Sequence, residues 1–376
     1  MKASRLSQLL TLPDERPHIH HFHSYPARFA PALVTGLLAE VPPGSVVFDP
    51  FAGSGTTLVE ARLRGCAAWG NDLNPLAALL CRVKARPLSL KDFSFLERDL
   101  AYLRKYIGTR LRTRGERQHV RMPPGERMFH PHVFWQLQTI VGGIERLRNA
   151  HHREIMLAAL SAMVNRVSLQ AKDSRPDRRV ERSVGSRGAA TIFQQTAEEL
   201  LVALRAFSRQ CKDGDLRVWQ EDARDMPAVP DASVDVIVTS PPYGGTYDYA
   251  EMHALRNLWL TLDWAPFERL EIGARRRQHD RTAQADLQAD LTAVFTALAR
   301  VARPQCRLYW VIADGVIHDQ AYRGDTLSAE MAAKAGWRVH AVGQVERAIW
   351  SAPERKAYGV RAKHEYLMEF RLEARG

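Results

Sequence analysis

A serine, two prolines and a tyrosine stand together directly after an apolar run. The run, Val234 to Val238, carries one charge and is typical of a buried parallel strand. The prolines end the strand and hold the next residues rigidly, because proline has a fixed φ and no N–H. In an open α/β sheet, ligands bind at the carboxyl ends of the strands. We therefore expect Ser240 to Tyr243 to present a hydroxyl, two rigid carbonyls and an aromatic ring at an active edge.

The exocyclic amine of a nucleobase is a substrate that suits this combination. Its lone pair is delocalised into the ring, so the amine becomes a better nucleophile when two acceptors bind its hydrogens and favour a tetrahedral nitrogen. Ser240 Oγ and a proline carbonyl could be those acceptors, and Tyr243 could stack on the face of the base. The alternative is a strand-ending Ser-Pro-Pro turn beside a core tyrosine, since turns rich in proline are common.

A second group of residues has the spacing of a nucleotide site. Ser45 to Asp49 is a short apolar strand, followed by the glycine turn Pro50 to Thr57 and then a helix, which is the first βα unit of a Rossmann-like sheet. The turn is not a Walker loop, because it lacks Gly-Lys-Ser/Thr. A second strand, Ala67 to Gly70, leads to Asp72, roughly twenty residues after the loop, where an acidic residue reaches ribose hydroxyls. An ordinary βαβ unit without a ligand is the alternative.

Further strands are expected to complete the sheet that positions these residues. Leu216 to Gln220 ends close to Asp222, whose carboxylate could accept a hydrogen bond from an adenine amino group. Later strands are expected at Cys306 to Ile312, Trp337 to Val345 and His364 to Leu372. With helices between about seven strands, the pattern predicts an α/β fold with a doubly wound, Rossmann-like sheet.

A long section with helical spacing interrupts this alternation. Between Ala85 and Lys212 the apolar residues follow a helical period and arginines are frequent, while Lys172 to Arg187 is expected to be a loop. The chain is therefore predicted to comprise residues 1–84 and 213–376 of one α/β domain and an inserted, mostly helical domain at 85–212. Arginines interleaved with aromatic residues fit phosphate contacts, although a solvated charged face is the alternative reading.

Composition favours a polyanionic partner. The 376 residues carry a net charge of +11, and the pI is near 9.7, both of which favour nucleic acid. No apolar stretch is long enough for a membrane span, and Met1 to Leu12 lacks the features of a signal peptide. The cysteines have no CxxC pair and are expected to be reduced core residues of a cytosolic protein: Cys66, Cys81, Cys211 and Cys306.

A histidine-rich run lies near the N-terminus. His18 to His23 reads His-Ile-His-His-Phe-His, which could bind a metal. No carboxylate or cysteine stands at a useful spacing, so we expect a surface segment and no metal site.

Two motifs together resemble the signatures of the amino-group DNA methyltransferases, which use S-adenosylmethionine. The sequence Asp-Pro-Phe-Ala-Gly-Ser-Gly-Thr at 49–56 looks like the family's cofactor loop, and Thr-Ser-Pro-Pro-Tyr at 239–243 looks like its catalytic motif. The stretch Tyr-Pro-Ala-Arg-Phe at 25–29 is similar to the pocket motif that precedes the loop. The resemblance covers about residues 20–80 and 215–372, and it implies a class I methyltransferase fold whose last strand is antiparallel.

The resemblance also implies roles for single residues. Asp72 would hold the ribose hydroxyls of the cofactor, Asp222 would face its adenine, and Asp49 would lie near its amino group. Ser240 and Pro241 would bind the target amine, and Tyr243 would stack on the extruded base. The implied cofactor residues are Tyr25, Pro26, Phe29, Asp49, Pro50, Phe51, Gly53, Gly55, Thr56, Asp72 and Asp222, and the implied catalytic residues are Ser240, Pro241, Pro242 and Tyr243.

The first residue of the catalytic motif, Ser240, correlates with the identity of the target base. Adenine-N6 enzymes of the family usually carry Asp or Asn there, and cytosine-N4 enzymes typically carry Ser, so Ser240 favours cytosine N4 in double-stranded DNA. Adenine N6, or an amino group in RNA, is the alternative. An inactive nucleic-acid-binding protein is a third reading, but its motifs would be degraded, and here they are intact.

The family's biology adds expectations about partners. The inserted domain would recognise the target sequence, and a cognate restriction endonuclease could accompany the enzyme in a restriction–modification system. We further expect a monomer or homodimer in the cytoplasm of a bacterium or archaeon, associated with the nucleoid through DNA.

Overall fold

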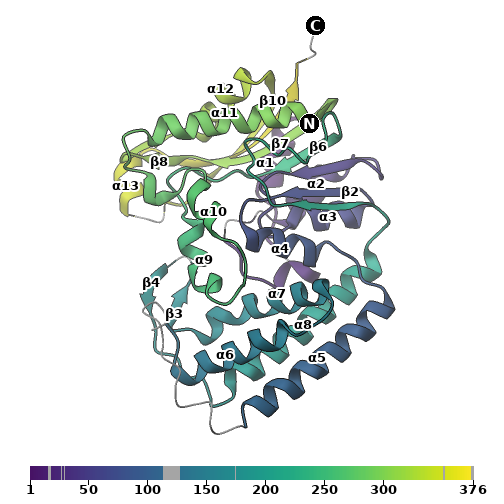
Figure 1. Ribbon diagram of the computed structural model, residues 1–376. Coiled ribbons are helices and arrows are strands. Elements are labelled where there is room, and N and C mark those ends of the chain that lie inside the picture. Colours follow the sequence, from purple (N-terminus) through teal and green to yellow (C-terminus); the bar gives the residue numbers. More distant parts are fainter. Residues whose placement is uncertain are drawn as a thin grey trace.

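A seven-stranded sheet forms the centre of the molecule, and helices lie against both of its faces (Figure 1). The computed structural model describes residues 1–15, 18–26, 28, 30–112, 128–173, 175–349 and 352–373. The strand order across the sheet is β10-β11-β7-β6-β1-β2-β5. The bounds are β1 Val46–Asp49, β2 Ala67–Asn71, β5 Leu216–Trp219, β6 Val234–Thr239, β7 Ala302–Ala313, β10 Trp337–Arg347 and β11 Lys363–Leu372. The predicted Rossmann-like α/β fold is thereby confirmed.

The direction of the strands follows the expected pattern. Strand β1 pairs in parallel with β2 and β6, β2 pairs in parallel with β5, and β6 pairs in parallel with β7. The last strand, β11, is antiparallel to both β7 and β10, as the resemblance implied. From β1 the chain goes outward through β2 to β5 and then returns to the other side of β1 as β6. This reversal opens a crevice at the carboxyl ends of β1 and β6, where ligands bind in such sheets.

Alternating side chains of the strands supply two hydrophobic cores. Val47 and Tyr309 face one core, whereas Phe48 and Trp310 face the other, because successive strand residues point to opposite faces. The first core includes side chains of α2 (Pro31–Leu38), α3 (Thr56–Arg64) and α4 (Pro75–Lys84). The second includes side chains of α11 (Ala283–Val301) and α12 (Gly324–Lys334). Near the N-terminus, α1 (Ala3–Leu10) packs against β10.

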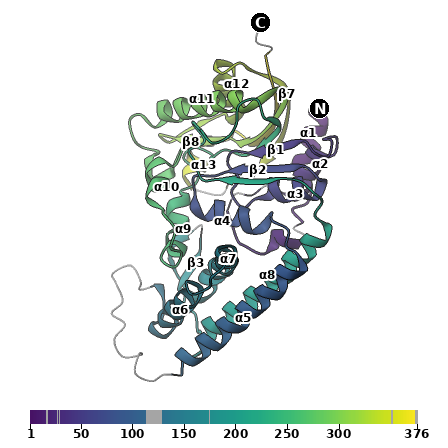
Figure 2. The same cartoon turned by 45° about the vertical axis from the view of Figure 1, so that its right-hand side comes forward.

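Four long helices form a lobe on one side of the sheet (Figure 2). They are α5 (Leu90–Arg110), α6 (Pro131–Ile144), α7 (Ala150–Val167) and α8 (Gly188–Gln210). Helix α5 starts at a capping box, in which the Ser89 side chain accepts from the N–H of Asp92 and the Asp92 side chain accepts from the N–H of Ser89.

The lobe also contains a hairpin that the sequence did not predict. Strands β3 (Gln170–Lys172) and β4 (Arg175–Arg179) are antiparallel, so the predicted loop at Lys172 to Arg187 is wrong for its first part. The arginine-rich sequence has no apolar alternation that would indicate a strand. Main-chain pairing between Gln170 and Arg179 holds the hairpin instead.

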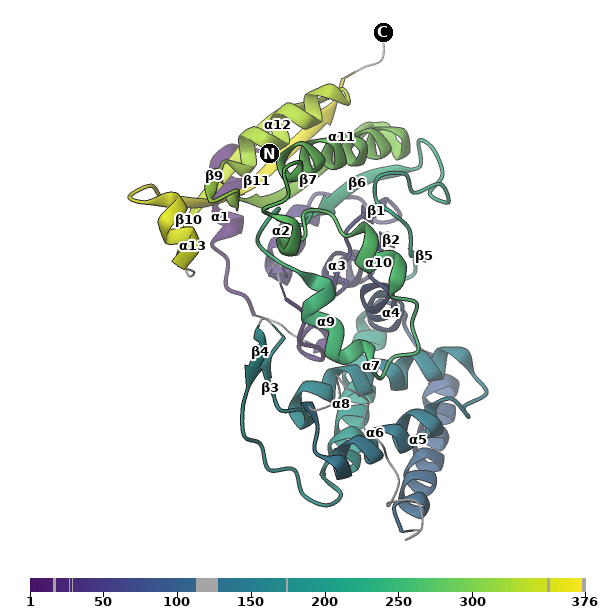
Figure 3. The same ribbon diagram turned by 60° about the vertical axis from the view of Figure 1, so that its left-hand side comes forward.

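The segment after β6 connects the sheet to the lobe (Figure 3). It contains α9 (Tyr249–Asn257), α10 (Ala265–Leu270) and a single 3-10 turn, Arg275–Arg277. The remaining short elements are η1 (His18–His21), β8 (Gly315–Ile317), β9 (Gln320–Tyr322) and α13 (Ala352–Tyr358).

The histidine run is not the surface segment that we expected. His20 and His23 are buried, with His20 Nε2 2.8 Å from a carboxylate oxygen of Glu60 and His23 Nε2 2.9 Å from Ser161 Oγ. The run therefore packs between α3 and α7. Within the described part of the chain, no group of three or more His, Cys, Asp or Glu side chains could hold a metal ion, and no helix is long and apolar enough to cross a membrane.

Candidate active site

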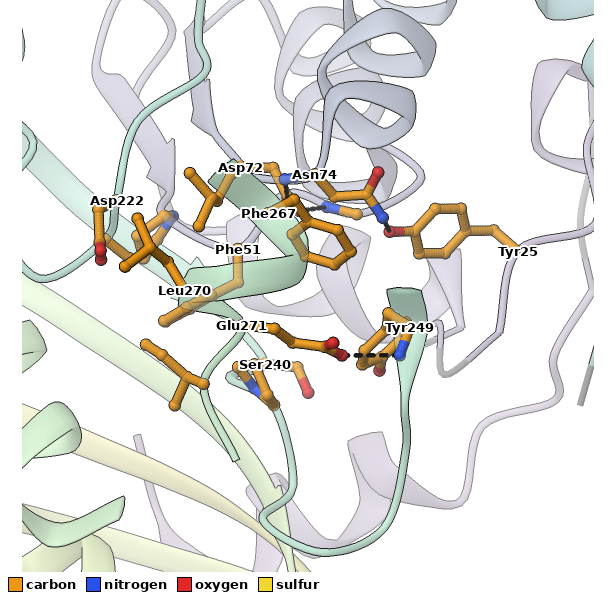
Figure 4. Close-up of a pocket in the computed structure, with 16 residues that line it drawn as sticks. Tyr25, Phe51, Asp72, Asn74, Asp222, Ser240, Tyr249, Phe267, Leu270 and Glu271 are labelled. Carbon is orange, nitrogen blue, oxygen red and sulfur yellow. Dashed lines mark hydrogen bonds between the residues drawn. The ribbon is translucent and has the colours of Figure 1, made fainter. Parts of the chain in front are cut away.

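A pocket lies at the carboxyl ends of β1, β2, β5 and β6 (Figure 4). The residues that follow each of these strands contribute to its wall. Its lining consists of Tyr25, Pro50, Phe51, Gly53, Asp72, Leu73, Asn74, Asp222, Ala223, Ser240, Pro242, Tyr249, Phe267, Leu270, Glu271 and Ile272.

The glycine turn after β1 needs its glycines for two different reasons. Gly53 and Gly55 have positive φ angles of 49° and 80°, which L side chains rarely adopt. A Cβ on Gly55 would also lie 3.2 Å from Cys81 Sγ, so the turn packs closely on α4. Gly55 is the N-cap of α3, and the N–H groups at the start of a helix favour negative charge nearby.

Asp72 is positioned by main-chain hydrogen bonds at the end of β2. Its Oδ2 accepts from the N–H of Gly53 at 2.8 Å, and its Oδ1 accepts from the N–H of Asn74 at 2.9 Å. Burial raises the pKa of Asp72 to about 7. A carboxylate oxygen can accept two hydrogen bonds, so each Asp72 oxygen keeps a lone pair for a hydroxyl of a ligand in the pocket.

Asp49 lies behind the pocket wall. Its Oδ1 accepts from Thr239 Oγ1 at 2.6 Å and from the N–H of Phe51 at 3.1 Å. It is buried, and burial raises its pKa to about 6. Asp49 therefore ties the end of β1 to the end of β6, and it is not among the pocket-lining residues.

Asp222 lines the pocket but is engaged by a neighbour. Its two oxygens accept from the main-chain N–H and the guanidinium of Arg224, which also binds Asp290. These contacts raise the pKa of Arg224. A bond from Asp222 to an adenine amino group would have to replace one of these bonds, and its role at the adenine stays a prediction.

Ser240 faces the pocket, and its hydroxyl is oriented by two further side chains. Ser240 Oγ donates to the hydroxyl of Tyr243 at 3.2 Å, and this hydroxyl donates to Glu365 Oε1 at 3.3 Å. Arg347 Nε donates to Glu365 Oε2 at 3.0 Å. Burial raises the pKa of Tyr243, so the phenol stays protonated and can donate. Because the hydrogen of Ser240 is directed at Tyr243, the oxygen of Ser240 is left as an acceptor.

Tyr25 forms the pocket wall that the N-terminal motif was expected to supply. Its ring would lie 3.4 Å from a Cβ on Gly53, and its hydroxyl accepts from Asn74 Nδ2 at 3.3 Å. The same amide group lies 3.1 Å from His253 Nδ1 on α9. Burial lowers the pKa of His253 to about 3, so its neutral ring accepts from the amide.

The chain after the catalytic motif closes the pocket from the opposite side. Glu271 accepts from the N–H of Tyr249 at 2.7 Å and from Arg276 at 2.6 Å, and these bonds fix the end of α10 against the start of α9. The residues that sequence reasoning missed are Leu73, Asn74, Ala223, Tyr249, Phe267, Leu270, Glu271 and Ile272. Only Asn74 carried a signal, because an Asn-Pro pair marks a helix start, and Asn74 accepts from the N–H of Leu76 at the start of α4.

The pocket brings together eight of the expected residues: Tyr25, Pro50, Phe51, Gly53, Asp72, Asp222, Ser240 and Pro242. Asp49, Gly55, Thr56, Pro241 and Tyr243 belong to the same segments but do not line it. Pro26 lines a neighbouring groove, and Phe29 lies outside the described residues.

These groups fit S-adenosylmethionine. The free lone pairs of Asp72 match ribose hydroxyls, and the glycine turn before α3 offers main-chain N–H groups to the carboxylate of the methionine end. Ser240 lines the same pocket (Figure 4).

Comparison with known proteins finds similarity to DNA methyltransferases. Residues 5–79 match the model of a family described as DNA methylase, the N6/N4 methyltransferases. The type II methyltransferase M.MvaI of Kocuria varians is 27% identical over 269 residues, which cover 65% of this chain and 58% of the relative. M.BsoBI of Geobacillus stearothermophilus is 22% identical over 66% of this chain and 54% of the relative. The chain thus spans a little more than half the length of these relatives.

Solved structures give only distant likenesses. A TehB-like S-adenosylmethionine-dependent methyltransferase from Corynebacterium glutamicum is 9% identical, with a TM-score of 0.33 over 90% of this chain and 87% of the other. An arsenic(III) S-adenosylmethionine methyltransferase from Chlamydomonas reinhardtii is 12% identical, with a TM-score of 0.34 over 91% and 74%. Because these likenesses are distant, the fold is assigned from the order and direction of the strands in the sheet. By the matched family model and the type II relatives, the chain is similar to the amino-group DNA methyltransferases, which use S-adenosylmethionine, and neither comparison separates the N4 and N6 types.

Proposed function

We propose that this protein transfers a methyl group from S-adenosylmethionine to the exocyclic N4 of cytosine in double-stranded DNA. The observation that carries the proposal is Ser240, whose oxygen is an acceptor at the edge of a pocket that also contains Asp72 and the glycine turn. The family and the type II relatives support a DNA substrate. The serine in the first position of the motif supports cytosine.

The bound cofactor supplies an electrophilic methyl group on a sulfonium. The side chains of the protein prepare the nucleophile. Ser240 Oγ, with its own hydrogen directed at Tyr243, accepts one hydrogen of the target amine, and the carbonyl of Pro241 accepts the other. These two bonds favour a tetrahedral nitrogen whose lone pair would attack the methyl carbon. The N–C bond would form as the bond between sulfur and the methyl group breaks, S-adenosylhomocysteine would leave as a neutral thioether, and the methylated nitrogen would lose one hydrogen to water as a proton. Holding the two reactants in line accounts for much of the rate, because it replaces an encounter in solution.

The target base must leave the DNA helix to reach Ser240. The cost of extrusion is a few kcal/mol, and a stacking surface in the pocket offsets part of it. The motif points to Tyr243 as the stacking ring, but Tyr243 does not line the pocket and Tyr249 does, so we propose Tyr249 as the ring that stacks on the base.

Nucleoside mass spectrometry would test the proposal. Plasmid DNA is incubated with the protein and methyl-labelled S-adenosylmethionine and then digested to nucleosides. We expect label in N4-methylcytosine, and the Ser240→Ala variant serves as the control that should give little. Label in N6-methyladenine would overturn the cytosine assignment and keep the fold and cofactor. Label only when RNA replaces DNA would overturn the DNA substrate.

A further inference from the structure

A groove lies beside the pocket, on the other side of Tyr25. Three segments form most of it: the end of α7, the β3–β4 hairpin with the residues after it, and the stretch around Tyr247 that follows the catalytic motif. Strand β4 packs against α9 here (Figure 3). We call this the hairpin groove, lined by Ser24, Tyr25, Pro26, Ala162, Asn165, Arg166, Ala171, Lys172, Asp173, Arg182, Tyr247, Met252 and Arg256. Because Tyr25 lines both cavities, the hairpin groove runs up to the wall of the active site.

The hairpin groove carries an excess of positive charge. Asp173, the one carboxylate among the described residues that line it, is neutralised by Arg256, whose guanidinium lies 2.7 Å away. Arg166, Lys172 and Arg182 also line it, and none of the three has a carboxylate partner among the described residues. Arg166 donates to Thr196 and Arg182 donates to the carbonyl of Arg166, which leaves further N–H groups on both guanidiniums.

Buried contacts hold the walls of the hairpin groove in place. Arg256 is 1% exposed and joins α9 to the hairpin through Asp173 and to α7 through the carbonyl of Ser161. Its guanidinium also lies 3.3 Å from His23 Nε2. Burial lowers the pKa of His23 well below its usual range, so this ring stays neutral beside the cation. Arg166, Lys172 and Arg182 thus extend from segments that buried contacts hold in place, which reduces the entropy lost when a ligand binds.

We propose that the hairpin groove binds the sugar–phosphate backbone of the DNA strand that carries the extruded base, with Lys172, Arg166 and Arg182 as phosphate ligands. This inference rests on the proposed function. Three cations from different segments suit successive phosphates of a strand better than one isolated anion. Their position next to Tyr25 and Tyr247 places the bound backbone where the base can enter the pocket beside Ser240.

The salt dependence of DNA binding tests this inference. Each phosphate contact contributes a slope of about −0.9 to the logarithm of the binding constant against the logarithm of salt concentration. Lys172 is exposed, and its side chain forms no hydrogen bond or ion pair within the described residues, so Lys172→Ala should not disturb the fold. Lys91 on α5 is also exposed and lies outside the hairpin groove, so Lys91→Ala is the matched control.

The binding of a labelled duplex is measured by fluorescence anisotropy between 50 and 200 mM salt, and calorimetry of S-adenosylmethionine binding checks that each variant is folded. We expect Lys172→Ala and Arg182→Ala each to reduce the slope by about 1 and weaken binding alike on unrelated duplexes, with Lys91→Ala unchanged. An unchanged slope in both groove variants would overturn the inference. A loss of affinity confined to one DNA sequence would also overturn the inference, because it would indicate contact with bases. A loss of affinity seen only when RNA replaces the DNA duplex would overturn it as well.

The same samples separate the inference from the proposed function. If the wild-type protein methylates DNA while the groove variants keep the wild-type slope, the phosphate site is wrong and the function stands. If the wild-type protein transfers no label to DNA, the proposed function fails, whatever the slopes show.

Discussion

The hydroxyl of Ser240 donates to the hydroxyl of Tyr243, which in turn donates to Glu365 on the last strand of the sheet. Burial of the tyrosine and the charge of the glutamate give this chain of hydrogen bonds one direction. The direction matters because a serine hydroxyl can be a donor or an acceptor, and only the acceptor assists an attacking amine. The last strand, which is remote in sequence, thus sets the hydrogen-bonding role of Ser240.

Removing the serine hydroxyl should abolish most turnover. We expect Ser240→Ala to lower the single-turnover methylation rate by roughly 100-fold, a typical loss when one group that stabilises a transition state is removed. The affinity for S-adenosylmethionine should not change, because no bond from Ser240 supports Asp72 or the glycine turn. A rate equal to that of the wild-type protein would exclude Ser240 from the reaction.

Exchanging Glu365 for glutamine should reverse the hydrogen-bond chain. Arg347 donates to Oε2, so the amide oxygen of Glu365→Gln is expected there and its NH2 group would face Tyr243. Tyr243 would then donate to Ser240, whose hydrogen would point at the target amine. We expect a rate loss of roughly tenfold or more with unchanged cofactor affinity. Tyr243→Phe leaves the hydroxyl of Ser240 free to rotate, so its methylation rate should fall less than that of Glu365→Gln. A Glu365→Gln variant as active as the wild-type protein would disprove the orienting role.

Tyr249 should contribute to binding of the extruded base. Its ring lines the pocket beside Ser240, and stacking of an aromatic ring on a base is worth about 1–3 kcal/mol. Tyr249→Ala should therefore weaken turnover of DNA roughly tenfold, and Tyr249→Phe should retain it. The comparison of single-turnover rates decides the point. If both variants lose activity equally, the hydroxyl and not the stacking surface is what matters.

The buried Asp49 should make the protein less stable as the pH rises. Its folded pKa is about 6, above the unfolded value of 3.8, so the folded state binds more protons between these values. The stabilisation is complete below pH 3.8 and is lost as the pH rises through about 6. Asp49→Asn keeps an acceptor for Thr239 and Phe51 and removes the titration.

Urea unfolding at pH 4.5 and 7.5 tests this expectation. Between pH 4.5 and 7.5 the free energy of unfolding of the wild-type protein should fall by about 2 kcal/mol more than that of Asp49→Asn, because one pKa unit corresponds to about 1.4 kcal/mol. Comparing the two proteins cancels the contribution of the buried histidines, whereas the contribution of Asp72 cancels only in part, because the charge of Asp49 raises the pKa of Asp72. Equal losses would show that Asp49 does not titrate in this range.

Two glycines, one before β1 and one in the glycine turn after it, offer a matched pair of substitutions. Gly44 and Gly55 have φ angles of 85° and 80°, but a Cβ on Gly44 meets nothing within 4 Å, whereas one on Gly55 meets Cys81. Gly44→Ala should cost about 1 kcal/mol of stability from backbone strain and leave cofactor binding intact. Gly55→Ala should cost more and also weaken S-adenosylmethionine binding. Thermal unfolding and calorimetry compare them, and equal effects would refute the packing argument.

The sequence predicted those parts of the site that are local in the chain. The strand–turn–helix around Gly53, the acid Asp72 and the strand ending at Ser240 each have their own short-range pattern, and the pocket contains all three. Phe267 and Glu271 could not be found in this way, because they reach the pocket only when α9 and α10 fold back over it.

Long-range contacts also explain the two wrong expectations. The histidine run is expected at the surface because no carboxylate or cysteine stands at metal-ligand spacing, but His23 is buried by α7, which lies more than a hundred residues later. The hairpin at Gln170 was assigned to a loop because its arginines hide any alternation, and its position depends on the buried pair of Asp173 and Arg256.

Helix α9 makes contact with the walls of both the pocket and the hairpin groove. One face of the helix carries His253, which binds Asn74 at the wall of the cofactor pocket, and one turn later it carries Arg256, which binds Asp173 in the hairpin. If the hairpin groove binds DNA as proposed, a displacement of the hairpin on binding would be transmitted to the pocket through this one helix. Thermodynamic linkage then requires reciprocity. If bound DNA multiplies the affinity for the cofactor by some factor, bound cofactor multiplies the affinity for DNA by the same factor.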